Sequence, residues 1–265
     1  MKYKSPFSLF FIIGISFGIN AQETEVTTPL VTDRPDATDA SSTVGAGVLQ
    51  IEAGGFYTSY EENNNKSETY GYNTTLVRYG ILENLELRIG WNFEEIRFSS
   101  NGTKNPNVLS GFSPLLAGAK IDIAQENGWK PEIALIGHVF LPFTAGEDYK
   151  PETTGADFRF SLSHTLSEKS SLGYNIGAQW GDDSSEIAYI YTLAYGYSIT
   201  DCFGFYAEVY GDFPENNEAN HFWDAGVTYL VNPNLQLDAT VGSGITKGQD
   251  ILLSAGLSYR IPKKK

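Results

Sequence analysis

The sequence contains very little cysteine, methionine and basic charge, and each shortage excludes a class of protein. One Cys and one Met among 265 residues exclude a disulfide framework, a cysteine-ligated zinc site and a Met-rich binding groove. Basic residues number 18 and acidic ones 32, so the formal net charge is -14 at pH 7, which argues against nucleic acid as a partner. Beyond the first two dozen residues no apolar run approaches the roughly 20 residues that a membrane-spanning helix needs. A bundle of transmembrane helices is therefore excluded.

The first residues have the pattern of a secretory signal. Lys2 and Lys4 precede an apolar stretch over 7–17, and the small residue Ala21 offers a cleavage site, so we expect residues 1–21 to be removed as a signal peptide. A short buried helix at a domain edge is the alternative reading of this stretch. No cysteine directly follows the apolar stretch, which argues against lipoprotein processing. The mature chain is thus expected to be exported.

Glycine and aromatic residues are abundant, with 27 Gly, 16 Tyr and 16 Phe, and apolar residues recur at every second position. Segment 85–93 has an apolar residue at every odd position and a polar residue or glycine at every even one, as in a strand with two unlike faces. About twelve such segments have the length of roughly 10 residues that a tilted membrane strand requires. They are 49–57, 70–79, 85–93, 115–123, 133–141, 158–164, 172–180, 187–199, 203–209, 223–229, 235–241 and 251–261.

The connections between these segments alternate between short and long. Short ones follow every second segment, as at 80–84, 167–170 and 231–234, and longer polar ones such as 61–67 and 99–111 lie between them. Short periplasmic turns, longer extracellular loops and an even strand count are typical of outer-membrane proteins. The sequence therefore predicts an all-β fold, an antiparallel transmembrane β-barrel of about 12 strands.

Aromatic placement favours the same fold. In 187–199 the residues Tyr189, Tyr191, Tyr195 and Tyr197 flank Leu193 on one face, as two interfacial girdles of a membrane strand do. An aromatic-rich β-sandwich, such as a secreted lectin-like domain, is the alternative. The final residues 254–261 resemble the C-terminal signal that hands barrels to the assembly machinery, so that machinery and outer-membrane lipid are the expected partners. We divide the chain into a signal peptide (1–21), a periplasmic N-terminal segment (22–46), the barrel (47–261) and a C-terminal tail (262–265).

Two stretches connect the sequence to a known family. The run Thr32-Asp33-Arg34-Pro35-Asp36-Ala37-Thr38-Asp39, continued through 47–54, and the run 76–88 resemble the opening and the second hairpin of the outer-membrane β-barrel transporter family of the phenol meta-pathway type. With the spacing of later strands, the resemblance covers nearly all of the mature chain. It implies a porin-like barrel related to channels for hydrophobic compounds, and no residue in these runs dictates the substrate.

Charged residues alternate with the apolar ones and are expected to face the lumen of the barrel. There they form either a charged constriction on the path of a small-molecule permeant or pairs that fill the lumen. Aromatic and apolar residues at the same parity complete the predicted wall. The predicted lumen and substrate-pathway residues are Arg78, Glu86, Arg88, Lys120, Asp122, His138, Phe140, Arg159, Tyr206, Glu208, Tyr210 and Asp238.

The run Asp33-Arg34-Pro35-Asp36 precedes the first strand and is a candidate N-terminal plug at the periplasmic mouth. Pro35 stiffens it, and Arg34 offers a guanidinium for which we predict a bidentate bond to Glu86. The alternative is a disordered leader.

The sequence offers no catalytic, metal or cofactor motif. Barrel phospholipases carry a His-x-Ser pair, whereas His138, His164 and His221 are followed two positions later by other residue types. Zinc spacing, glycine-rich phosphate loops and dinucleotide fingerprints are absent from the sequence. We therefore predict a non-enzymatic outer-membrane channel or transporter for small hydrophobic or aromatic molecules. The alternative is a structural or adhesive outer-membrane barrel with a plugged lumen and partner-binding loops.

Overall fold

A computed structural model describes residues 30–181, 186–246 and 248–261, so the predicted signal peptide and C-terminal tail lie outside the described residues. Most of the described chain is β-strand. Among these residues no helix is long and apolar enough to cross a membrane. The strands are β1 (Leu49–Glu62), β2 (Asn65–Leu82), β3 (Leu85–Ser100), β4 (Thr103–Phe112), β5 (Leu115–Ala124), β6 (Glu132–Leu141), β7 (Gly155–Ser167), β8 (Ser170–Trp180), β9 (Ile187–Ser198), β10 (Phe203–Pro214), β11 (Asn220–Asn232), β12 (Leu235–Gly244) and β13 (Gln249–Ile261).

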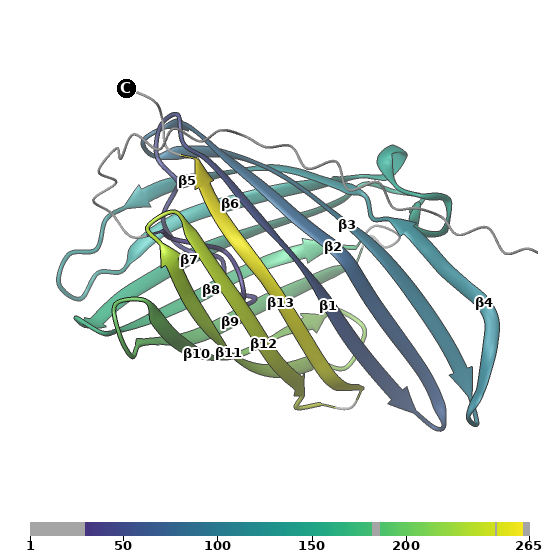
Figure 1. Cartoon of the computed structure of the whole chain (residues 1–265). Helices are drawn as coiled ribbons and strands as arrows, with labels where there is room; N and C mark the ends of the chain where they lie inside the picture. The colour runs from purple at the N-terminus through teal and green to yellow at the C-terminus, as the bar shows by residue number, and fades with distance from the viewer. Residues whose placement is uncertain (1–29, 182–185, 247, 262–265) are drawn as a thin grey trace, which may run out of the picture.

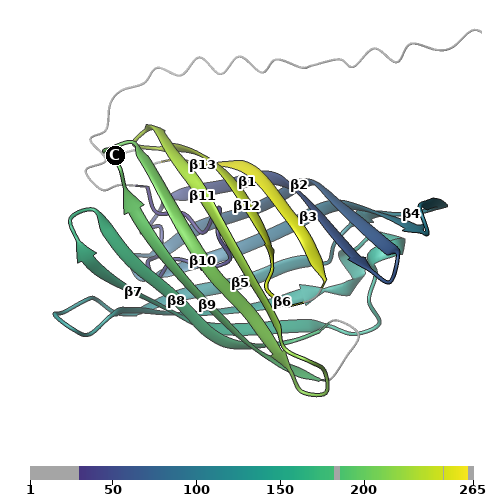
Figure 2. The same ribbon diagram turned by 90° about the horizontal axis from the view of Figure 1, so that it is seen from below.

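The sheet closes on itself. Neighbouring strands pair antiparallel around the wall, and β1 pairs with β13 over its length, from Leu49 opposite Ile261 onward. Figures 1 and 2 both show the first and last strands side by side. Closure gives the strands that cross lipid a neighbour on both sides, which satisfies their backbone groups, whereas β4 pairs on one side, with β3. The prediction of an antiparallel barrel is confirmed.

The barrel wall has 12 strand positions around its circumference, although 13 strands are distinguished. Both β4 and β5 pair with β3: β4 with the second half of β3, and β5 with the first half. Together they occupy one strand position that is interrupted in the middle. Ser113 and Pro114 lie at the break. Proline has no backbone N–H to donate to a ladder, which explains why pairing is interrupted there.

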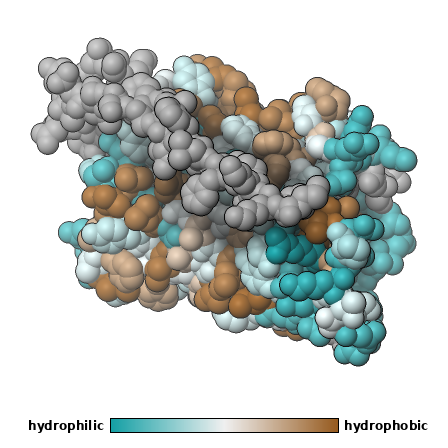
Figure 3. Space-filling view, turned by 45° about the vertical axis from the view of Figure 1, so that its right-hand side comes forward, coloured by the Kyte–Doolittle hydropathy of each residue, from teal (hydrophilic) through white to brown (hydrophobic). Residues whose placement is uncertain are grey.

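The wall exposes apolar side chains on its outer face and buries charged ones on its inner face, the reverse of a water-soluble barrel. On β3, Leu87 and Ile89 are each 44% exposed, whereas the alternating Glu86 and Arg88 are 0% and 2% exposed. Hydrophobic side chains accordingly cover much of the outer surface in Figure 3. An apolar exterior around a charged interior is the arrangement that a membrane imposes on a β-barrel.

The barrel has two unlike ends. We call the end with the short turns, among them 83–84, 168–169 and 233–234, the turn end, and the opposite one the loop end. The connection from β6 to β7 at the loop end contains two short 3-10 helices, η1 (Pro142–Thr144) and η2 (Glu147–Tyr149).

The sequence interpretation of 61–67 and 99–111 as loops is wrong. Both are hairpins in which long strands continue past the apolar band and reverse at Asn63-Asn64 and Asn101-Gly102. Asn63, Asn64 and Asn101 have positive φ angles, which asparagine tolerates better than most residues and which tight hairpins need. Their strands carry polar residues on both faces here, so the alternation that identifies membrane strands is missing.

An aromatic band marks where the apolar wall ends toward the loop end. Its rings lie 5.0 to 6.4 Å apart, centroid to centroid, from β1 across to β4. Such bands sit at the level of lipid headgroups. The rings belong to Tyr57, Tyr70, Tyr72, Phe93 and Phe112.

We predict that an arginine in the middle of the apolar band destabilises the barrel. Ile89→Arg should cost about 2–4 kcal/mol in unfolding free energy, because the guanidinium would face hydrocarbon at mid-depth. The matched control Leu82→Arg, at the turn end of β2, should cost about 0–1 kcal/mol. Equal costs in denaturant titrations of the protein refolded into vesicles would contradict a lipid-facing wall.

Candidate functional site

The chain before β1 runs inside the barrel. Residues 30–46, which we call the luminal segment, enter the interior and return to the turn end before Leu49. Polar contacts fasten this segment to strands around most of the circumference. Its partners are Glu52 on β1, Arg78 on β2, Arg88 on β3, Lys120 on β5, Glu132 on β6, Arg159 on β7, Asn175 on β8, Thr192 on β9, Glu208 on β10, Asp238 on β12 and Ser254 on β13.

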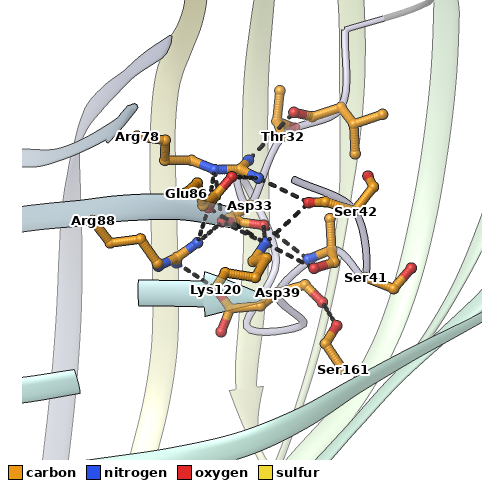
Figure 4. A network of polar contacts seen from close by, with 12 residues as sticks. Thr32, Asp33, Asp39, Ser41, Ser42, Arg78, Glu86, Arg88, Lys120 and Ser161 are labelled. Carbon is orange, nitrogen blue, oxygen red and sulfur yellow. Dashed lines mark hydrogen bonds and ion pairs between the residues drawn. The ribbon is translucent and has the colours of Figure 1, made fainter. Parts of the chain in front are cut away.

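Asp33 is the centre of a buried ion network (Figure 4). Its carboxylate pairs with Arg88, lies 3.0 Å from Lys120 Nζ and 3.4 Å from Arg78 Nε. Its backbone N–H donates to Glu52. Three cations from three strands therefore converge on one carboxylate that the luminal segment supplies.

Two wall carboxylates complete the network. Glu86 accepts two hydrogen bonds from Arg78, at 2.9 and 3.0 Å, and one from Arg88 at 3.0 Å. Glu52 accepts from Arg78 Nη1 at 3.0 Å. With Asp33, three acids thus balance the three cations, all with side chains no more than 4% exposed. Buried charges are tolerated only when they are paired, so removal of the luminal segment would leave this cluster one acid short.

The ion network also sets the protonation state of Asp33. Burial raises the pKa of its carboxyl, but the nearby Arg78, Lys120 and Arg88 lower it by more, and the pKa lies well below the ordinary range. Asp33 is therefore ionised at neutral pH. A carboxyl with a lowered pKa stabilises the fold above its ordinary pKa, and this contribution is lost as the pH falls through the lowered value.

A second acid of the segment extends the network to β6 and β7. Asp39 accepts from Arg88 at 2.8 Å and from Arg159 at 3.1 Å. Arg88 Nε also donates to His138 Nε2, and His138 Nδ1 lies 2.9 Å from Asp157. Both ring nitrogens of His138 are thus engaged by charged wall residues, which leaves neither available to activate a nucleophile.

The opposite side of the lumen holds the segment differently. Glu208 accepts from the backbone N–H of Ala37 at 2.7 Å and from the hydroxyl of Thr38. Asp36 of the segment and Asp224 of the wall lie near Glu208, so three carboxyl groups are gathered on this side of the lumen. Burial and then the charge of Glu208 raise the pKa of Asp36 well above its ordinary value. This contact is therefore built on hydrogen bonds and weakened by repulsion, whereas the Asp33 side is built on ion pairs.

Arg34 is bound to a different residue from the one predicted. The predicted bond to Glu86 is wrong, because Glu86 is occupied by Arg78 and Arg88. Arg34 instead donates to both oxygens of Asp238, from Nε at 3.2 Å and from Nη2 at 2.9 Å. The two residues are 204 positions apart.

Two cavities lie on either side of the luminal segment. The one toward the loop end has a volume of about 620 Å³, with the apolar side chains of Leu76, Leu116 and Phe140 beside charged groups such as Arg88 and Arg159. The one toward the turn end has a volume of about 410 Å³ and is mainly hydroxylic. Its lining includes Pro35 and Asp36 of the segment, and Thr165, Ser167, Ser170, Ser171, Ser198 and Thr228 of the wall.

The structure places the predicted lumen residues in three groups. Arg78, Glu86, Arg88 and Lys120 form the Asp33 network, which Arg88 extends to His138. Tyr206, Glu208, Tyr210 and Asp238 lie on the opposite wall. Phe140 and Arg159 line the larger cavity, whereas Asp122 lies apart near the turn end, where it accepts from Gln125 at 2.6 Å.

Sequence reasoning missed several contacts of the luminal segment. Asp39 lies in the run that carries the family resemblance but is not among the predicted site residues. Asn175 and Thr192 hold the segment on β8 and β9, and both are buried at 0% and 7% exposure. Their inward parity would have placed them in the lumen, although nothing in their own strands indicates a partner in the N-terminal segment.

Comparison with known proteins identifies the family profile and the fold. Residues 32–261 match the profile of the family described as "Putative MetA-pathway of phenol degradation". No curated protein sequence matches the chain. The structure is similar to that of an outer membrane channel from Pseudomonas putida F1, with a TM-score of 0.65, 14% sequence identity and coverage of 86% of this chain and 100% of the other.

Two further solved structures share the architecture. The KdgM porin in complex with disordered oligogalacturonate has a TM-score of 0.54 and 8% identity, over 80% of this chain and 98% of that one. The β domain of the Bordetella autotransporter BrkA has a TM-score of 0.54 and 12% identity, over 82% and 100%. At these identities the likeness shows the fold of outer-membrane barrels.

We predict opposite effects for two neighbouring acids of the luminal segment. Asp33→Asn should destabilise the barrel by about 3–5 kcal/mol, because it removes the acid that the luminal segment supplies to balance the buried cations Arg78, Arg88 and Lys120. Asp36→Asn should raise the melting temperature at pH 7, because it removes a carboxylate held near Glu208 and Asp224. Since a raised pKa makes the acid less destabilising as pH falls, the gain from Asp36→Asn should shrink on acidification. Thermal unfolding at pH 5 to 8 measures both, and a loss of stability in Asp36→Asn would contradict the assignment of repulsion there.

Proposed function

The chain belongs to the family described as "Putative MetA-pathway of phenol degradation", and from this premise we propose that it is an outer-membrane channel for small hydrophobic or aromatic molecules. The observation that carries the proposal is the cavity of about 620 Å³ inside a membrane-type barrel. Its volume is within the range of roughly 300–1,000 Å³ found for small-molecule sites.

The lining of this cavity fits an amphiphilic permeant. Leu76, Leu116 and Phe140 give an apolar side against which a ring or an alkyl chain can pack. The floor is charged, but its cations are paired with Asp33, Asp39 and Asp157, so the cavity presents ion pairs rather than bare charge. An uncharged molecule with one polar group suits such a lining better than a bulk ion.

The proposed orientation follows from the two ends of the barrel. Outer-membrane barrels have short turns in the periplasm and longer connections outside the cell. We place the turn end, with the luminal segment's entry and the hydroxylic cavity, on the periplasmic side. A permeant then enters the larger cavity from outside and leaves through the smaller one.

The luminal segment acts as a plug in this proposal. It lies between the two cavities and is fastened to both sides of the wall. The alternative function, a structural or adhesive barrel, is favoured by the same observation, because a segment so thoroughly bonded can close the lumen permanently. The two functions differ in whether the plugged protein passes small molecules at all.

A non-enzymatic role fits the three histidines. His138 is engaged on both nitrogens by Arg88 and Asp157, while His164 and His221 each face a tyrosine hydroxyl, at 3.3 and 2.9 Å. None of these recorded partners is a serine or cysteine that a histidine could activate.

We predict that the mature protein fractionates with the outer membrane. It should migrate faster on a gel when unheated than after boiling, because a folded barrel resists detergent. Membrane fractionation with a heat-modifiability assay tests this. Recovery as a freely soluble periplasmic protein would contradict the proposed location.

We predict that deletion of residues 22–46 from the mature chain opens the lumen. Single-channel conductance in planar bilayers should rise by at least about threefold over the intact protein, since the two cavities become continuous. Retained heat-modifiability in the same preparation shows that the barrel still folds. If neither the intact nor the shortened protein conducts or takes up small aromatic solutes, the channel proposal fails and the structural barrel is favoured.

A further inference from the structure

Arg34 occupies a position that no other described residue shares. Arg34 lines the cavity toward the loop end and also the one toward the turn end, and of the residues the structure describes it alone lines both. A path that joins the two cavities at this point therefore passes Arg34.

The guanidinium lies against two glycines of the wall, Gly54 and Gly256, which we call the glycine seat. Gly54 on β1 and Gly256 on β13 are paired across the seam where the barrel closes. A Cβ atom added to Gly54 would lie 2.6 Å from Arg34 Nη2, and one added to Gly256 would lie 2.4 Å from it. Only residues without a side chain leave room for the guanidinium at this depth of the wall.

Arg34 reaches from this seat to three neighbouring strands. Besides the two bonds to Asp238 on β12, Nη1 donates to Thr74 on β2 at 3.3 Å and Nη2 to Ser254 on β13 at 3.2 Å. Asp238 is the acid with which it forms an ion pair, and the side chain of Asp238 is fully buried. The guanidinium thus spans the junction of β1 and β13, where the barrel closes.

The Arg34 side chain is held separately from the acids that anchor the rest of the segment. Asp33 and Asp39 each bind at least two buried or half-buried wall cations, and lifting them out would strand those charges. Arg34 is 16% exposed at its side chain and is held by its ion pair with Asp238 and by hydrogen bonds to Thr74 and Ser254. Asp238, Thr74 and Ser254 do not belong to the Asp33 network, so a rotation of the Arg34 side chain leaves that network intact.

We propose that Arg34 is the gate of the channel and determines its charge selectivity, the luminal segment staying in place while the guanidinium leaves its glycine seat. This inference rests on the proposed channel function. In the closed state Arg34 blocks the path and neutralises Asp238. In the open state the path runs between Arg34 and Asp238. The positive charge of Arg34 favours anions and the negative charge of Asp238 favours cations.

The decisive experiment compares two single variants in planar bilayers. Arg34→Ala and Asp238→Asn should each raise the open-channel conductance by at least about twofold, because each removes the ion pair that holds the guanidinium across the path. Their reversal potentials in a salt gradient should shift in opposite directions: Arg34→Ala toward cations, because Asp238 is uncovered, and Asp238→Asn toward anions. The double variant should conduct as well as the singles with a selectivity close to the wild type. Shifts in the same direction, or conductance unchanged in both, would overturn the proposal.

The glycine seat offers a second, independent test. Gly256→Ala should expel the guanidinium and raise conductance with the charge inventory unchanged. Gly55→Ala is the matched control on β1, because its added Cβ would also meet backbone, the oxygen of Gly71 at 2.8 Å, while no atom of Arg34 lies nearer to it than 4.0 Å. Equal conductance changes in both variants, each verified as folded by heat-modifiability, would mean that wall distortion rather than Arg34 controls the path.

Cysteine labelling separates a side-chain gate from loss of the whole plug. Ser41 is buried at 4% exposure, so Ser41→Cys in a Cys202→Ser background should resist a water-soluble maleimide. It should stay unlabelled when Arg34→Ala is added, although conductance rises. Labelling in that variant would show that the segment leaves the lumen and would overturn the gate. If the protein lacking residues 22–46 conducts but Arg34→Ala does not, the gate fails while the channel function stands.

Discussion

The buried pairing of Asp33 with Arg78, Arg88 and Lys120 is the interaction on which the interior of this barrel depends. These cations come from β2, β3 and β5, and the wall acids Glu52 and Glu86 balance only two of them. The third acid comes from the luminal segment. Because an unpaired charge in a buried site is far more costly than a paired one, the wall and the segment form a single folded unit. The same pairing keeps Asp33 ionised and fixes the depth at which the segment crosses the lumen.

That fixed depth creates the division of the lumen into two cavities. The segment is held by ion pairs on the side of β2 to β7 and by hydrogen bonds to Glu208, Thr192 and Asn175 on the side of β8 to β10. Between these two anchored parts, Arg34 spans the seam of the barrel. Because the partners of Arg34 lie outside the Asp33 network, its side chain can move while the acids of the segment stay bound, so a channel and a tightly bonded plug are compatible in one molecule.

The membrane imposes the remaining constraint. Strands that cross hydrocarbon must satisfy every backbone group and turn apolar side chains outward, so all charge is forced inward or beyond the apolar band. The lumen is therefore where the acidic chain places its buried polar groups, among them His138, Asp157 and Arg159. Past the aromatic band the constraint lapses, and β1 to β4 continue as polar hairpins.

The sequence by itself determined the wall, because inward and outward positions follow from a local period of two, and one strand such as β3 displays it completely. It also placed Arg78, Glu86, Arg88 and Lys120 in the lumen and singled out the run around Asp33. It did not determine β4, whose residues lie beyond lipid and lose the alternation. Nor did it determine the partner of Arg34, which was taken to be Glu86. Closure of β1 against β13 brings Asp238 and Gly256 to the N-terminal segment from some 200 residues away, and contacts made by closure leave no trace in local spacing.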